Sequence, residues 1–160
     1  MVKDLDNAPT DTEVFKLQVL GSNILFSANG GLWTSDGTFS GTYLLSNNGP
    51  VDGVVSTHIA PNSVVANDLY FYTSFDANGY ELWASDGTSA GTYMVKDINP
   101  NGSSSPVQLV ARSGYILFTA KFSDIEDSEL WRSDGTTNNT FLLKDICPED
   151  YCSGLLPLPF

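Results

Sequence analysis

The stretch Glu81-Leu82-Trp83-Ala84-Ser85-Asp86-Gly87-Thr88, continued by Ser89-Ala90-Gly91-Thr92-Tyr93-Met94-Val95-Lys96-Asp97-Ile98, recurs through the chain. Its core, Leu-Trp-x-Ser-Asp-Gly-Thr, occurs three times, around Trp33, Trp83 and Trp131. These tryptophans are spaced by 50 and then 48 residues. Recurrence at such a period indicates a repeat architecture, in which one small unit buries its apolar faces against its neighbours.

The repeats divide the chain into similar units. Residues 1–12 match the last strand and loop of a repeat, 13–50, 51–100 and 101–150 are three repeats, and 151–160 resemble the start of a further repeat or a tail. Because both ends fall within a repeat, we expect the sequence to be a piece of a longer array. Each unit contains four short alternating or apolar segments separated by Gly- and Asn-rich turns. Four strands in roughly 48 residues are typical of one β-propeller blade.

Composition favours a soluble, loop-rich β protein. Of the 160 residues, 41% are hydrophobic, which is enough for a packed core, and 14 are glycine. No apolar run approaches the ~20 residues of a membrane span, and the charged start at Val2–Asp6 does not resemble a signal peptide. The formal charge of −12 argues against nucleic acid, which needs a basic surface. We interpret this charge mainly as solubility; attraction of divalent cations is the alternative.

The motif predicts a two-stranded hairpin. With Asp86 and Gly91 closing the loop, Ser85 faces Thr92, Trp83 faces Met94 and Glu81 faces Lys96. The same register sets Glu129 opposite Lys144 in the third unit, and Gly31 opposite Ser46 in the first. Because both charged partners are absent together from the first unit, we expect Glu81–Lys96 and Glu129–Lys144 to be cross-strand ion pairs.

The Asp-Gly pairs of the motif predict structural turns. Asp accepts hydrogen bonds from backbone N–H groups two or three residues on, and Gly adopts positive φ without steric cost. In the third unit Asn139 replaces the second glycine, and we expect it to be tolerated because Asn adopts the left-handed region readily. A calcium-binding or catalytic role for these carboxylates is the alternative. The turn residues are Asp36, Gly37, Asp86, Gly87, Asp134 and Gly135.

The motif resembles the ELWxxDGT repeat, and the resemblance covers essentially the whole chain in three copies. The copy from Glu81 to Pro100 matches best; the first copy lacks the Glu and the Lys-Asp pair, and the third lacks the second Gly. Such repeats are similar to propeller repeats and are found mainly in large secreted or surface-attached microbial proteins. The resemblance implies an extracellular or cell-surface location and supplies no catalytic residues.

Several other residues are candidates for a site. Cys147 and Cys152 could close a small disulfide in an oxidising compartment, or remain two thiols. Asp124, Glu126 and Asp127, with Glu129, could bind calcium, although a solvated hairpin tip is the interpretation that we favour. Asn101 and Asn138 lie in glycosylation sequons at predicted turns. His58, the one histidine, has no partner pattern for catalysis.

We therefore predict an all-β array of about three propeller-like blades, with no firm cofactor or metal. Three blades rarely close a ring, so we expect completion by a longer chain or by other copies, through open blade edges, into rings or filaments. The predicted function is a non-enzymatic structural or adhesive protein. A carbohydrate-binding propeller is the alternative, and a propeller-borne hydrolase a more distant one.

Overall fold

The computed structural model describes residues 13–51, 63–123 and 128–146, which form an all-β structure. In these ranges the chain forms three antiparallel sheets of four strands, and consecutive strands pair in each. The same ranges contain no helix that could cross a membrane. Sheet 1 comprises β1 (Val14–Leu20), β2 (Asn23–Ala28), β3 (Gly31–Ser35) and β4 (Tyr43–Ser46); sheet 2 comprises β5 (Ser63–Ala66), β6 (Leu69–Asp76), β7 (Gly79–Ser85) and β8 (Thr92–Lys96); sheet 3 comprises β9 (Val107–Arg112), β10 (Tyr115–Ala120), β11 (Glu129–Ser133) and β12 (Phe141–Lys144).

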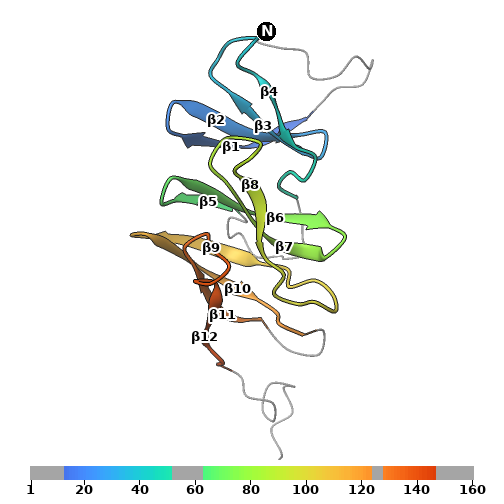
Figure 1. Ribbon diagram of the computed structural model, residues 1–160, viewed down its shortest axis with the longest axis vertical. Helices are drawn as coiled ribbons and strands as arrows, with labels where there is room; N and C mark the ends of the chain where they lie inside the picture. Colours follow the sequence, from blue (N-terminus) through green and yellow to red (C-terminus); the bar gives the residue numbers. More distant parts are fainter. Residues whose placement is uncertain (1–12, 52–62, 124–127, 147–160) are drawn as a thin grey trace, which may run out of the picture.

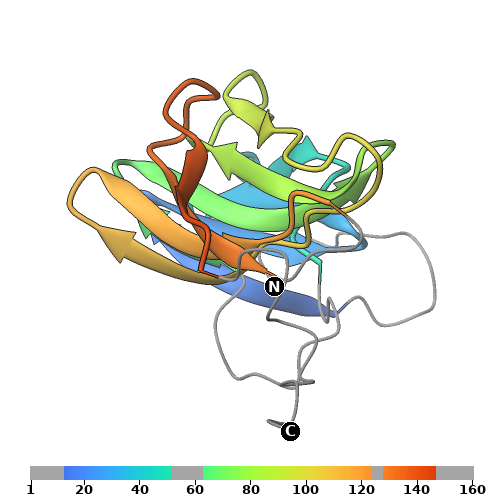
Figure 2. The same cartoon turned by 90° about the horizontal axis from the view of Figure 1, so that it is seen from below.

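The three sheets are stacked one on another in the order of the sequence (Figure 1). Viewed from below, the sheets lie over one another along the stack (Figure 2). The prediction of an all-β chain with four-stranded antiparallel repeats is confirmed. The described residues form a stack rather than a closed ring, so the assignment to a propeller stays a prediction.

Each sheet has two different faces, because side chains alternate along a strand. We call the face with Leu32, Leu82 or Leu130 the leucine face, and the face with Trp33, Trp83 or Trp131 the tryptophan face. The leucine face of one sheet packs on the tryptophan face of the next. Between sheets 1 and 2 the buried residues are Leu20, Leu25, Leu32, Leu45, Tyr70, Tyr72 and Trp83.

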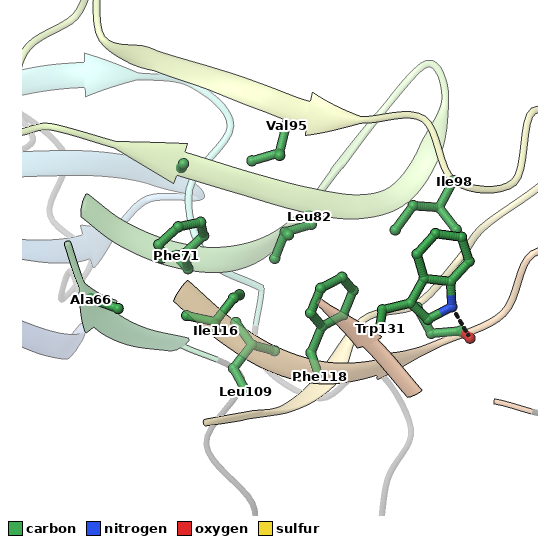
Figure 3. Packing of buried hydrophobic residues seen from close by; sticks show 11 residues of the cluster. Ala66, Phe71, Leu82, Val95, Ile98, Leu109, Ile116, Phe118 and Trp131 are labelled. Carbon is green, nitrogen blue, oxygen red and sulfur yellow. Dashed lines mark hydrogen bonds between the residues drawn. The ribbon is translucent and has the colours of Figure 1, made fainter. Parts of the chain in front are cut away.

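The contact between sheets 2 and 3 has the same plan. Phe71, Leu82 and Val95 of sheet 2 face Ile116, Phe118 and Trp131 of sheet 3 (Figure 3). The Trp131 indole N–H donates to the carbonyl of Ala120 at 3.2 Å, which fixes the orientation of the ring within the core. Because Leu82 and Trp83 point to opposite faces of sheet 2, neighbouring residues of one motif pack against sheet 3 and sheet 1, respectively.

The hairpin between β6 and β7 has a tight turn, because β6 continues to Asp76 and β7 begins at Gly79. The Asn78 N–H donates to the Asp76 carboxylate at 2.8 Å, and Gly79 has φ of +90°. These two features allow the short turn.

The expected pairings of Glu81 with Lys96 and of Glu129 with Lys144 are wrong. The register begins as predicted, with Ser85 opposite Thr92 and Trp83 opposite Met94, but it then shifts so that Leu82 faces Lys96. In sheet 3, Leu130 likewise faces Lys144. A β-bulge adds one residue to the last strand and moves each lysine past its expected glutamate.

Candidate functional site

The Asp-Gly-Thr turns are held by hydrogen bonds to the aspartate. The backbone N–H and the hydroxyl of Thr88 donate to Asp86 Oδ1 at 2.8 and 2.7 Å. The Asp36 and Asp134 carboxylates accept the same two hydrogen bonds in the other sheets. Gly37, Gly87 and Gly135 all have positive φ, between +89° and +99°. The carboxylates therefore shape the turns of their own hairpins.

The second glycine of the motif is favoured for a steric reason, not because the backbone there is left-handed. Gly91 does not have positive φ, but a Cβ atom there would collide with the Asp86 carboxylate. Asn139, the equivalent residue in sheet 3, donates its amide to Asp134 Oδ2 at 2.7 Å. Hydrogen bonding to the aspartate, rather than tolerance of the left-handed region, explains how Asn fits this position.

The Asp134 turn predicts a specific loss of stability in acid. Burial acts to raise the pKa of Asp134, but the hydrogen bonds from Thr136 and Asn139 outweigh it and lower the pKa below its usual value of 3.8. A depressed pKa in the folded state stabilises the fold above pH 3.8, and this contribution is lost as the pH falls through the depressed value. The stability advantage of the wild type over Asp134→Asn should therefore shrink below pH 3.8, as measured by urea unfolding at several pH values. An advantage that stays constant or grows down to pH 2 would contradict this assignment.

Glu81 is fully buried and binds the segment that connects sheet 2 to sheet 3. Its carboxylate accepts hydrogen bonds from the backbone N–H groups of Ile98, at 3.1 Å, and Ser104, at 2.9 Å, and from the Ser104 hydroxyl. Burial raises the pKa of Glu81, and the nearby Asp97 acts in the same direction, while these hydrogen bonds act against it. The carboxylate thus fixes a connection 17 to 23 residues away along the chain.

A glutamate that accepts a hydrogen bond from a backbone N–H also occurs in sheet 3, whereas in sheet 1 packed backbone takes the place of the glutamate. Glu129 accepts a hydrogen bond from the Ile146 N–H at 2.7 Å. In sheet 1, Gly31 occupies the position of the glutamate. The backbone of Gly49 packs directly against Gly31, so that a Cβ atom on Gly49 would collide with it. The Gly49 N–H donates to the carbonyl of Gly30 at 2.9 Å. Backbone therefore occupies the space that a glutamate fills in the other sheets.

The remaining sequence candidates are distributed as follows. Asn101 and Asn138 are both exposed, in the loop after β8 and in the turn before β12. Cys147, Cys152, Asp124, Glu126, Asp127 and His58 lie outside the described residues. Within the described ranges, His, Cys, Asp and Glu side chains form no group of three that could hold a metal ion.

The stack ends in two open faces of different kinds. Among the described residues, no further sheet lies on the tryptophan face of sheet 1 or on the leucine face of sheet 3. Phe26 and Ala28 on the tryptophan face of sheet 1 are nevertheless buried. Ile24 is 40% exposed, whereas Tyr70 and Ile116, which occupy its position in the other sheets, are fully buried. Leu143 is 45% exposed, whereas Val95, its equivalent, is 1% exposed. The two exposed apolar faces are the candidate functional site.

The open leucine face of sheet 3 has two further features. A shallow hollow of about 660 Å³ lies over β9, β10 and β11, with Val110, Leu117 and Leu130 in its lining. Arg132 stands where the other sheets have Ala84 and Thr34, both fully buried. The triplet Trp-Arg-Ser, in place of Trp-Ala-Ser and Trp-Thr-Ser, is the signal of this difference in the sequence, and a role for Arg132 was not predicted.

No protein-family model matches the chain, and no curated protein or solved structure is significantly similar to it. The resemblance to ELWxxDGT repeats therefore stays a prediction made from the motif.

Proposed function

We propose that the chain is a non-enzymatic structural or adhesive repeat module that associates with further copies of itself through its outer sheets. The exposed apolar residues at the two ends of the stack carry this proposal. Ile24 and Leu143, whose equivalents are buried between sheets, are 40% and 45% exposed at the ends of the stack. Exposed apolar surface of this kind marks interaction sites in soluble proteins.

The non-enzymatic part of the proposal is supported by the roles of the acidic residues. Asp36, Asp86 and Asp134 accept hydrogen bonds within their own turns, and Glu81 and Glu129 bind backbone N–H groups. Carboxylates with these structural partners are engaged in holding the backbone. A scaffold function accounts for their recurrence in the repeats.

Two of the three tryptophans of the motif support a structural function more than carbohydrate binding; Trp33, on the outer face of sheet 1, is partly exposed. Trp83 and Trp131 are 7% and 6% exposed and pack between sheets. Stacking on a sugar requires an accessible ring face, which these residues do not offer. An extracellular or cell-surface location is the further part of the proposal, supported by the acidic composition and by the exposed sequon residues Asn101 and Asn138.

Self-association is directly measurable. We expect the purified 160-residue chain to show a weight-average mass that rises with protein concentration in sedimentation experiments, because contact with a second copy would remove the exposed apolar residues of its end faces from water. Far-UV circular dichroism of the same samples verifies that the β fold is intact. A folded chain that stays at 17.3 kDa at every concentration would refute the proposal.

A further inference from the structure

Side chains of β8 in sheet 2 form hydrogen bonds with the β11–β12 hairpin of sheet 3. The Lys96 ammonium donates to the carbonyl of Thr140 at 2.8 Å and lies 6.0 Å from the centre of the Trp131 ring. The Tyr93 hydroxyl donates to the carbonyl of Gly135 at 3.1 Å. These contacts join the same two sheets as the apolar cluster of Figure 3.

The two outer faces of the stack have residues at the same repeat positions as those that form this contact. Lys144 of sheet 3 occupies the position of Lys96, opposite the motif leucine, and it is exposed. On sheet 1, Trp33 and Thr42 occupy the positions of Trp131 and Thr140. Their shared hydrogen bonds identify these positions: Thr42 pairs with Ser35, and Thr140 with Ser133, both at 2.7 Å.

The turn glycines mark which side of a sheet meets its predecessor. A Cβ atom on Gly87 would lie 3.5 Å from Leu20 of sheet 1, and one on Gly135 would lie 2.5 Å from Leu69 of sheet 2. Gly37 of sheet 1 has no neighbour within 4 Å of such an atom. The turn of sheet 1 is therefore free to lie on a preceding sheet.

We infer that two copies of this chain stack head to tail, with the leucine face of sheet 3 in one copy on the tryptophan face of sheet 1 in the next. In this arrangement Lys144 lies over Trp33 and donates to the carbonyl of Thr42, as Lys96 does with Trp131 and Thr140. The inference rests on the self-association proposed above and assigns its surfaces. Because the two faces differ, the contact is heterologous and repeats along an open filament or closes into a ring.

Arg132 fits this arrangement through its charge and its position. Arg132 faces Phe141, as Ala84 faces Tyr93, and its guanidinium lies 4.2 Å from the centre of the Tyr115 ring. Phe141 lacks the hydroxyl that Tyr93 donates to Gly135. In the stacked arrangement, the Arg132 guanidinium supplies N–H donors for the carbonyl of Gly37 in the next copy, which is the equivalent of the Gly135 carbonyl. The exposed Asp36 carboxylate of the same turn complements its charge.

Single glutamates placed on each face test the arrangement. Ile24→Glu blocks the face of sheet 1, and Leu143→Glu blocks the face of sheet 3; both residues are already exposed in the single chain. Phe75→Glu, at a residue 55% exposed on the β6–β7 hairpin, is the control for added negative charge. Burying an unpaired carboxylate in an apolar contact should weaken self-association at least about a hundredfold for either blocked variant.

The decisive measurement is sedimentation of the blocked variants alone and mixed in equal amounts. We expect each blocked variant to be monomeric where the wild type assembles, and the mixture to form dimers that grow no further, since it retains one open face of each kind. The Phe75→Glu control should assemble like the wild type. Three results would overturn the head-to-tail arrangement and leave the proposed function standing, provided that the wild type assembles. The first is that both blocked variants still assemble, and the second is that their mixture forms no dimer. The third is that Phe75→Glu disrupts assembly as much as the blocked variants do. A monomeric wild type would refute both.

Discussion

Glu81→Ala is expected to lower the free energy of unfolding by about 3–5 kcal/mol, the largest effect of any change considered in this protein. The substitution removes the acceptor for three hydrogen bonds from Ile98 and Ser104, and all of these groups are buried. Each buried donor left without a partner costs about 1–3 kcal/mol. Chemical denaturation followed by circular dichroism measures the loss.

The chain offers matched comparisons for this prediction. Glu129→Ala removes the acceptor of the hydrogen bond that the Ile146 N–H donates, and should cost about 1–3 kcal/mol. Glu81→Gln keeps the volume of the side chain and an acceptor oxygen, so it should be less destabilising than Glu81→Ala. Glu13→Ala, at an exposed residue, should change stability by no more than about 0.5 kcal/mol. If Glu81→Ala cost no more than Glu13→Ala, the carboxylate would not hold the connection between the sheets.

Gly135→Ala is expected to cost about 2–4 kcal/mol, because two independent penalties act at this residue. Gly135 has φ of +99°, a conformation that strains an alanine by about 1–3 kcal/mol. A Cβ atom there would also lie 2.5 Å from Leu69 and 3.4 Å from Phe71, within the contact between sheets 2 and 3. Relieving this overlap by movement of Leu69 costs roughly 1 kcal/mol or more.

Gly37→Ala separates the two penalties. Gly37 lies in the equivalent turn with φ of +89°, but a Cβ atom there meets nothing within 4 Å. The two variants share the backbone strain, so the extra loss in Gly135→Ala reports the contact between sheets. Both should be measured by urea denaturation at low protein concentration, where the single chain predominates. Equal losses in the two variants would show that the turn of sheet 3 does not press on sheet 2.

Much of the fold could be predicted because it depends on short-range chemistry. The alternation along β7 and the Asp-Gly turn at Asp86 are readable from a few neighbouring residues, and both give the hairpin of the motif. The register near the turn follows from the turn itself, which is why the pairing of Trp83 with Met94 was predicted correctly. Repetition then extends the prediction to all three sheets.

The errors lie where distant residues take part. The bulge at Val95 places both Val95 and Lys96 toward sheet 3, where one joins the core and the other reaches Thr140. Glu81 accepts hydrogen bonds from Ile98 and from Ser104, and Ser104 lies on a connection that no local pattern relates to the motif. An ion pair was a reasonable expectation from the joint loss of two charged residues in the first repeat. Their loss instead accompanies the replacement of the glutamate by packed backbone at Gly31 and Gly49.

By itself, the sequence determined the repeat, the strands and the turns of this protein, because alternation and turn chemistry act within a few residues of one another. Only the tertiary structure decided which face of each sheet meets which, what the buried glutamates bind, and which residues remain uncovered at Ile24 and Leu143. Those outcomes depend on the packing of one sheet against the next, and identical motifs become buried or exposed according to whether a neighbour is present.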